Sequence, residues 1–370
     1  MAKVLMKGNE AIGEAAIRAG CIHFFGYPIT PQSEVPEYLA KRLPEVGGKY
    51  VQAESEVAAS NMIYGAAGVG VRVLTTSSSP GISLMSEALS YIAACELPVV
   101  LVNIMRSGPG LGGILPAQSD YLHATKGTAH GDFKMIVLAP ASVQEAVDLM
   151  QLAFTLAEKY LNPVMIIGDG MIGQMMEPVE FPAEGAVKPL DPGDWALTGA
   201  KGRPKRIINS LHLDPEVCYR QNLKLSAKYE RIAAHEQRWE TYGDDRPYDV
   251  LVTAFGMTSR IAKTAIDELK HEGLNVALFR PISLQPFPYD ALRTAAKKAK
   301  RIFDIEMNMG QMLQDVKIAL GPDVPIDFFG TAGGVVPSPE QAREKILASI
   351  GKAGGGGVTP KPKPAKRSAK

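Results

Sequence analysis

The chain has 370 residues, of which 46% are hydrophobic and 21% charged, an ordinary balance that permits a sizeable core and two or three domains. Its formal net charge is +1, which argues against nucleic acid as the main partner, because phosphate binding needs concentrated positive charge. No apolar run reaches membrane-spanning length, since Glu96 interrupts the longest candidate.

The first part of the chain, residues 1–185, alternates short apolar runs with longer amphipathic runs. This alternation predicts a parallel, doubly wound α/β sheet. Ser33 is the expected N-cap of the second helix. Strands are expected over 21–28, 49–53, 71–79, 97–105, 133–140 and 162–170, and helices over 8–20, 33–48, 55–70, 83–96 and 142–160.

The remaining chain divides into three predicted segments. Residues 186–245 form an interdomain crossover with little strand signal, in which a helix is expected over 215–242. Residues 246–350 form a second, smaller α/β domain, with strands over 248–256, 275–283, 301–308 and 326–330, and helices over 257–273, 289–300 and 338–350. Residues 351–370 are rich in Gly, Pro and Lys and predict a disordered basic tail.

The start of the chain and its cysteines suggest a compartment. The segment "MAKVLMKGNEAIG" lacks the apolar core of a signal peptide. Cys21, Cys95 and Cys218 are far apart and lack metal-ligand spacing. They are expected to be reduced core thiols of a cytoplasmic protein.

Two glycine motifs have competing interpretations. The segment "GPGLGG" (108–113) has the G-x-G-x-x-G spacing of a nucleotide-binding dehydrogenase, but Pro116 breaks the helix that should follow. The segment "GDG" (168–170) resembles the magnesium-diphosphate motif of thiamine diphosphate enzymes, but the asparagine that completes that motif is missing between residues 189 and 202. Asp169 is therefore interpreted as a turn residue, and no metal site is predicted.

Four polar side chains follow predicted strands. Thr30 lies in the proline-rich turn "GYPITPQSE". This turn either only connects a strand to a helix or rigidly supports the Thr30 hydroxyl. Glu54 and Glu56 come after a strand expected to be buried, and they either complement a helix N-terminus or supply a buried carboxyl for proton chemistry. Arg106 ends an apolar strand and either binds a carboxylate or pairs with an acid such as Glu54.

Several segments occur together, in the order found in one family: "GYPITPQSE", "QAESEVAASNMIYGAAGVG", "TTSSSPGISLMSEALSY", "VNIMRSGPGLGG", "HGD", "LAPAS" and "NPVMIIGDG". The chain resembles the α subunit of the 2-oxoacid:ferredoxin oxidoreductases, and within them the branched-chain (2-ketoisovalerate, 3-methyl-2-oxobutanoate) type. The resemblance covers about residues 3–348, including "RPISLQPFP" and "IEMNMGQM". It implies a pyrimidine-binding domain for thiamine diphosphate, followed by a transketolase C-terminal-like domain.

The resemblance also implies partners and cofactors. A β subunit would bind the diphosphate and Mg²⁺, and a γ subunit and a ferredoxin-like δ subunit with iron–sulfur clusters would complete a dimer of hetero-oligomers. Ferredoxin would accept the electrons, and coenzyme A would take the acyl group. This division would explain why this chain has an incomplete "GDG" motif and no cluster cysteines.

Site residues carry over position by position. Glu56 matches the glutamate that hydrogen-bonds the aminopyrimidine ring of thiamine diphosphate, and Thr30 and Arg106 match residues that touch the oxoacid. Four further cofactor contacts are expected at Pro28, Ile29, Ser79 and Pro80. Glu54 is expected to face elsewhere, because a helix starting between the two glutamates breaks the strand alternation.

The loop after Arg106 bears on the substrate. Leu111, Ile114 and Leu115 are apolar, which favours an aliphatic oxoacid over 2-oxoglutarate, although a methylene discriminates by only about 1–3 kcal/mol and pyruvate-like substrates remain open. Two other functions compete with this one: a nucleotide-binding dehydrogenase and a non-catalytic scaffold subunit.

Overall fold

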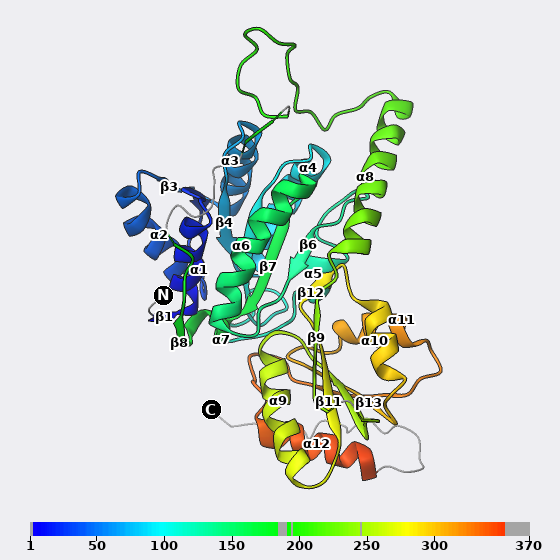
Figure 1. The fold of residues 1–370 in the computed structure, drawn as a ribbon. Helices are drawn as coiled ribbons and strands as arrows, with labels where there is room; N and C mark the ends of the chain where they lie inside the picture. The colour runs from blue at the N-terminus through cyan, green and yellow to red at the C-terminus, as the bar shows by residue number, and fades with distance from the viewer. Residues whose placement is uncertain (1–2, 184–190, 194, 245, 352–370) are drawn as a thin grey trace, which may run out of the picture.

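The computed structural model describes residues 3–183, 191–193, 195–244 and 246–351 (Figure 1). The strands are β1 (Val4–Lys7), β2 (His23–Gly26), β3 (Lys49–Gln52), β4 (Leu74–Ser77), β5 (Val100–Met105), β6 (Ile136–Leu138), β7 (Val164–Asp169), β8 (Met176–Val179), β9 (Trp239–Tyr242), β10 (Val250–Thr253), β11 (Val276–Pro281), β12 (Ser283–Gln285), β13 (Ile302–Glu306) and β14 (Ile326–Gly330). The helices are α1 (Gly8–Arg18), α2 (Glu34–Glu45), α3 (Glu56–Gly68), α4 (Pro80–Ala94), α5 (Tyr121–Thr125), α6 (Val143–Tyr160), α7 (Gly170–Gln174), α8 (Pro215–His235), α9 (Gly256–His271), α10 (Tyr289–Ala296), α11 (Met312–Leu320) and α12 (Pro339–Gly351). Of the tail predicted over residues 351–370, Gly351 ends α12, and residues 352–370 lie outside the described residues.

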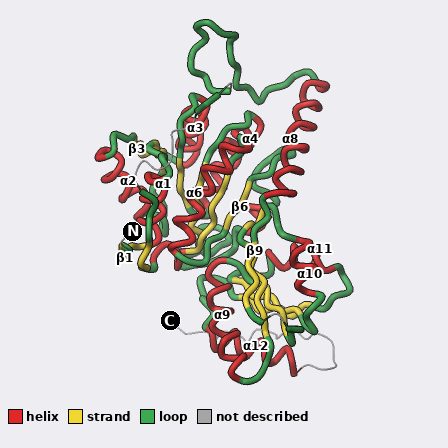
Figure 2. Tube along the Cα trace, viewed as in Figure 1, coloured by secondary structure: helices red, strands yellow, loops and turns green. Residues whose placement is uncertain are grey.

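The larger sheet has the order β12-β6-β7-β5-β4-β2-β3, and all its strands are parallel except β12, which pairs antiparallel with β6. The smaller sheet has the order β14-β13-β10-β11-β9, with β9 as its antiparallel edge. Figure 2 shows helices on both sides of the strands. The prediction of a doubly wound α/β fold followed by a smaller α/β domain is confirmed.

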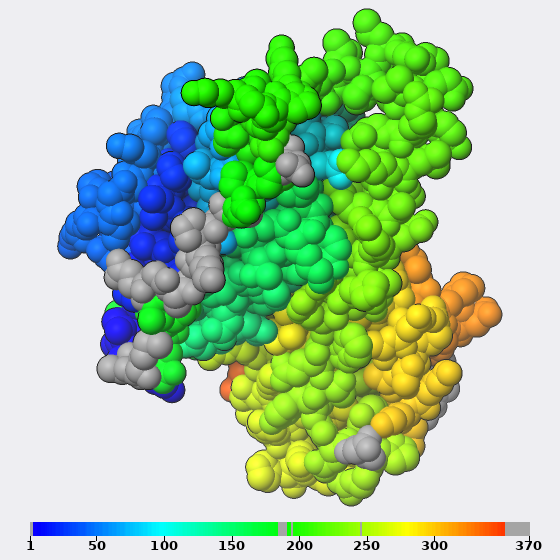
Figure 3. Space-filling model, turned by 45° about the horizontal axis from the view of Figure 1, so that its top comes forward, coloured from blue at the N-terminus to red at the C-terminus, as the bar shows by residue number. Residues whose placement is uncertain are grey.

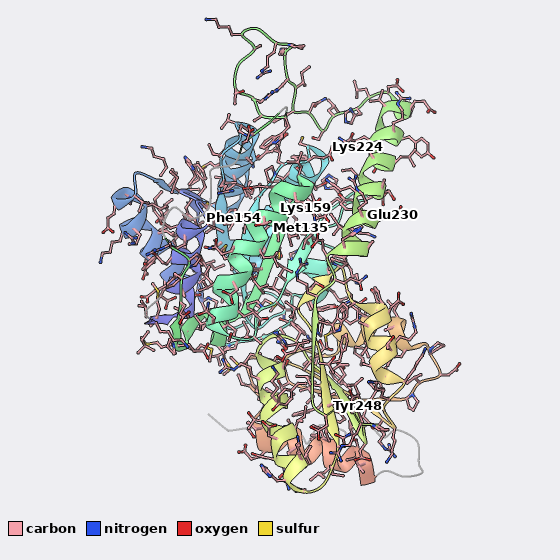
Figure 4. All side chains as sticks on the ribbon, in the orientation of Figure 1. Met135, Phe154, Lys159, Lys224, Glu230 and Tyr248 are labelled. Atoms are coloured by element: carbon pink, nitrogen blue, oxygen red, sulfur yellow. The ribbon has the colours of Figure 1, made fainter. Side chains whose placement is uncertain are left out.

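Side chains of the central strand β5 show how the larger sheet is covered. Val100, Val102 and Ile104 join a core cluster with residues of α1, α2 and α6, while Leu101 and Met105 join another with residues of α3 and α4. Successive side chains of a strand point to opposite faces, so a strand buried on both faces is largely apolar, and β5 is apolar except at Asn103. Figure 4 labels Phe154 of the first cluster and Met135 and Tyr248 of the second.

The two sheets share a core. The cluster on the α3–α4 face continues into the smaller domain, where it includes Leu251 and Phe279 of the sheet and Met312 of α11. The smaller domain is also fixed by its own segment β12, which extends the larger sheet. Figure 3 shows the yellow-to-orange smaller domain packed directly against the green part of the larger one. The domains therefore form one continuous body.

Helix α8 runs alongside the larger domain. Leu225, Tyr229 and Ile232 reach its core, and Lys224, labelled in Figure 4, pairs with Glu96. Burial lowers the pKa of the neighbouring Lys228 to about 8, although the carboxylate of Glu96 opposes this shift.

Four details of the predictions are wrong. The helix expected over 215–242 ends at His235, and Trp239–Tyr242 forms β9 against β11, because Trp, Thr and Tyr favour strands and a partner edge is present. Strand β3 is a half-exposed edge strand and is not buried. Ser33 precedes α2 but makes no capping hydrogen bond, since its backbone is already helical (φ −56°, ψ −31°). Cys218 is exposed and is not a core thiol.

Candidate functional site

Four adjacent parallel strands deliver the predicted site residues to one edge of the larger sheet. Neighbours β5, β4, β2 and β3 all end at this edge, and the segments that follow them carry Arg106, Ser79, Thr30 and Glu56 respectively. Ligands of such sheets bind outside the carboxyl ends of the strands. The structure therefore brings the predicted residues to the edge where a ligand is expected.

The proline turn is fixed by two neighbouring elements and by a hydrogen bond of its own. Asn9 of α1 is fully buried and donates to the carbonyl of Pro31 at 2.8 Å. Gln32 is also fully buried, donates to the Tyr27 carbonyl at 3.2 Å and accepts from the Thr76 hydroxyl at 2.5 Å. The turn is thus held by α1 and β4 while the Thr30 side chain stays exposed.

Arg106 lies beneath this turn. Its side chain is 6% exposed, and its two terminal nitrogens donate to the carbonyls of Thr30 (3.0 Å) and Leu111 (3.2 Å). Within the described part of the chain its Nε has no hydrogen-bond partner and its guanidinium no ion pair, so a pair with Glu54 does not form. Since both acceptors are neutral carbonyls, the positive charge is not compensated and suits an anionic ligand.

Glu56 is the buried carboxylate of the edge. It is 5% exposed and opens α3, whose N-cap Ser55 accepts from the amide of Ala58 at 3.2 Å. Glu54, two residues earlier, is exposed, as expected for a helix that begins between them. Among the described residues no group hydrogen-bonds the Glu56 carboxyl, so both of its oxygens are available to a ligand.

Gly81 forms a cradle against that carboxyl. A Cβ on Gly81 would lie 2.6 Å from Glu56 Oε1 and 2.0 Å from the Ser77 hydroxyl. Only glycine allows the first turn of α4 to approach Glu56 this closely. The hydroxyls of Thr75, Ser77 and Ser78 are buried and, in the part of the chain that the structure describes, lack hydrogen-bond partners. The edge thus combines a buried acid with polar groups that a ligand can satisfy.

Ser79 connects this cradle to Arg106. Its backbone is left-handed (φ 27°), a conformation that a non-glycine residue keeps only when its surroundings enforce it. Its amide donates to Asn103 Oδ1 (3.0 Å), and its hydroxyl donates to Asp120 (2.6 Å) and accepts from the Arg106 amide (3.0 Å). Pro80 then begins α4 at the position where proline is favoured.

Asn103 and Asp120 also contact this edge, and neither was predicted from the sequence. Asn103 could have been suspected, because it is the one polar residue within the apolar run "VLVNIM". Asp120 carries no local signal, since it comes after a loop and its contacts are with distant residues.

The two glycine motifs have structural roles. The "GPGLGG" segment is a closed loop, with the Gly113 amide on the Ser107 carbonyl (2.9 Å), and the next helix, α5, begins only at Tyr121. This is not the strand–glycine–helix arrangement of a dinucleotide site. Asp169 is not a turn residue: it ends β7 and caps α7 by accepting from the amides of Met171 and Ile172, and burial raises its pKa to about 6.

Comparisons with known proteins define the class. The family described as "Pyruvate flavodoxin/ferredoxin oxidoreductase, thiamine diP-bdg" matches residues 14–239, and "Pyruvate:ferredoxin oxidoreductase core domain II" matches residues 248–342. The chain therefore belongs to the 2-oxoacid:ferredoxin oxidoreductase family, as a subunit with a thiamine diphosphate-binding domain.

Particular relatives refine this assignment. The chain is 47% identical to the ketoisovalerate oxidoreductase subunit VorB of Methanothermobacter thermautotrophicus, over 95% of this chain and 99% of that one. It is 34% identical to the 2-oxoglutarate synthase subunit KorA of the same organism, over 92% and 97%. The 2-oxoglutarate:ferredoxin oxidoreductase of Magnetococcus marinus, solved with 2-oxoglutarate, coenzyme A and succinyl-CoA bound, superimposes with a TM-score of 0.83 at 28% identity. It covers 94% of this chain, which spans only 65% of that one.

Proposed function

We propose that this chain is the α subunit of a branched-chain 2-oxoacid:ferredoxin oxidoreductase, which decarboxylates a 2-oxoacid such as 2-ketoisovalerate and forms acyl-CoA and carbon dioxide while reducing ferredoxin. The observation that carries this proposal is the Glu56 carboxyl, which is buried against Gly81 at the carboxyl edge of the sheet and has no hydrogen-bond partner among the described residues. The 47% identity to a ketoisovalerate oxidoreductase subunit supports the branched-chain type.

The residues of the edge fit the pyrimidine half of thiamine diphosphate. Glu56 offers a buried carboxyl that can share a proton with a ring nitrogen, and the glycine at position 81 leaves room beside it. Thiamine diphosphate supplies, when bound, the electron sink for decarboxylation of a 2-oxoacid. The role of Glu56 is to hold a proton at its carboxyl and to orient the aminopyrimidine. Pro28, Ile29, Ser79 and Pro80 border the same edge and would contact the cofactor.

Thr30 and Arg106 are proposed to recognise the oxoacid. Arg106 presents an uncompensated charge for the substrate carboxylate, and the exposed Thr30 hydroxyl is held next to it through the Thr30 carbonyl. A hydroxyl that orients a substrate must stay in place, which the buried anchors Asn9 and Gln32 ensure. The fixed turn supports the interpretation of Thr30 as a support for one hydroxyl.

The site is proposed to be completed by other chains. A β subunit would bind the diphosphate and Mg²⁺, because Asp169 of the "GDG" segment already caps α7 with its carboxylate. A γ subunit and a δ subunit with iron–sulfur clusters would carry electrons to ferredoxin, in a dimer of hetero-oligomers that takes coenzyme A as cosubstrate. We place this assembly in the cytoplasm. No helix among the described residues is long and apolar enough to span a membrane.

The loop after Arg106 supports an aliphatic substrate. Leu111, Ile114 and Leu115 are all exposed and apolar, and none of them could bind the distal carboxylate of 2-oxoglutarate.

The test is turnover by the assembled enzyme, purified with the products of neighbouring genes. Reduction of a viologen dye is measured with coenzyme A and, in turn, 2-ketoisovalerate, pyruvate and 2-oxoglutarate. We expect kcat/KM to be highest for 2-ketoisovalerate, by about 10- to 200-fold over pyruvate. Preference for 2-oxoglutarate would contradict the branched-chain assignment, and an inactive assembly with every 2-oxoacid would favour a scaffold role.

A further inference from the structure

The segment after the Arg106 loop is held by the smaller domain. Gln118 is fully buried, and its backbone amide donates to the Met307 carbonyl at 2.9 Å. Its side chain donates to the Phe255 carbonyl (2.8 Å) and accepts from the Met307 amide and the Thr258 hydroxyl (3.1 Å each). Asn308 donates to the Gln118 carbonyl at 2.8 Å. The smaller domain thus fixes the chain two residues before Asp120.

The residues on either side of Asp120 are held in the same way. Gln311 of the smaller domain donates to the Ser119 carbonyl at 2.6 Å and accepts from the Leu122 amide at 2.9 Å. Asp120 is therefore placed by contacts from a domain that itself contributes none of the predicted site residues.

Asp120 in turn reaches the sheet edge. One of its oxygens accepts from the Ser79 hydroxyl (2.6 Å) and from the Asn103 amide group (2.9 Å), and Asn103 also accepts from the Ser79 backbone amide. These contacts close around Ser79, whose backbone is left-handed. The next residues, Pro80 and Gly81, form the turn against Glu56.

We propose that Asp120 is a positioning residue for the reaction, through which the smaller domain holds Ser79 and hence the α4 turn that faces Glu56. The inference rests on the proposed function for its kinetic part. It assigns the smaller domain a direct role in shaping the site, beyond its packing.

The surroundings of Asp120 allow a clean substitution. The residue is half-buried and lines a cavity of about 380 Å³ between the two domains, together with Ser107, Asn308 and Gln311. Asp120→Asn keeps the size of the side chain and removes only its charge, so the fold is expected to remain intact.

The first readout is hydrogen exchange in the assembled complex, which needs no turnover. The amides of Ser79, Gly81 and Ser83 donate to Asn103, Ser78 and Ser79. Asp120→Asn removes a charge-assisted bond and should accelerate their exchange by about tenfold or more. Glu145→Gln is the matched control, because Glu145 pairs with Arg280 across the same domain boundary at 2.7 Å but does not touch Ser79. It should lower Tm without changing exchange in this segment.

The second readout is a double-mutant cycle on kcat/KM. Asp120→Asn and Ser79→Ala should each lower kcat/KM by about tenfold, and the double variant should fall no further than the worse single variant. Multiplicative losses, or unchanged exchange at residues 79–83, would overturn the proposal. An inactive wild-type complex would instead refute the proposed function, and the exchange experiment would still decide the role of Asp120.

Discussion

Replacing Glu56 by Gln perturbs the proposed chemistry most selectively. The substitution keeps the shape of a side chain that is 5% exposed and removes only its ability to hold a proton. A positioned proton-transfer group contributes about 10²- to 10⁴-fold to rate. We therefore expect kcat to fall by that factor, equivalent to about 3–5 kcal/mol in the activation free energy.

The stability of the variant should change little. No hydrogen-bond donor among the described residues binds the Glu56 carboxyl, so the substitution leaves no partner unsatisfied. We expect the free energy of unfolding to change by about 1 kcal/mol or less, which corresponds to a Tm shift of about 2–4 °C at most.

The assay is 2-oxoacid- and coenzyme A-dependent dye reduction by the assembled enzyme, with thermal unfolding measured on the same preparations. Glu54→Gln is the matched control, because Glu54 is exposed two residues away, and it should retain wild-type kcat. Activity of Glu56→Gln within a few-fold of the wild type, in a complex that still assembles, would refute the role assigned to Glu56.

Three further perturbations test other parts of the account. Gly81→Ala should lower both kcat and Tm, because its Cβ would meet Ser77 and Glu56 at an overpacking cost of about 1–3 kcal/mol. Gly65→Ala is the control: Gly65 lies in α3 with open space around it, so this variant should keep wild-type activity. Equal losses of kcat in the two variants would contradict the role of Gly81. Thr30→Val should raise KM for the oxoacid about three- to tenfold without lowering Tm. Unchanged kinetics would mean that the turn only connects β2 to α2. Asp169→Asn tests the raised pKa of Asp169. Between pH 3.8 and about 6 the Asp169 carboxyl binds a proton in the folded state more readily than in the unfolded state. The free energy of unfolding of the wild type should therefore fall with rising pH across this window, by up to about 3 kcal/mol relative to the variant. Urea unfolding at pH 4 to 7 measures the free energy of unfolding of both proteins. A difference between them that does not change with pH would contradict the prediction.

The strand ends that carry the candidate site residues could be predicted from local sequence patterns. Apolar runs alternating with helices imply a parallel sheet, and the carboxyl ends of parallel strands lie at one edge. Thr30, Ser79 and Arg106 could therefore be expected to lie near one another, and the structure joins them by hydrogen bonds. The orientation of Glu56 away from Glu54 followed from the helix start between them.

Features that depend on distant residues could not be predicted. The edge position of β3 depends on the strand order, and β9 exists because β11 offers it an edge. Asp120 and Gln118 acquire their roles only when the smaller domain folds onto the loop after Arg106. Even a local rule failed at Ser33, whose backbone geometry excludes the cap that its residue type suggests.

The central claim is that this chain supplies the pyrimidine half of a divided thiamine diphosphate site. The most direct measurement is calorimetric titration of thiamine diphosphate with Mg²⁺ into this chain alone, into its β-type partner alone and into the two together. The account predicts tight, stoichiometric binding only by the pair, and weakened binding when Gly81→Ala narrows the cradle. Tight binding by the partner alone, unchanged by this chain or by Gly81→Ala, would contradict it.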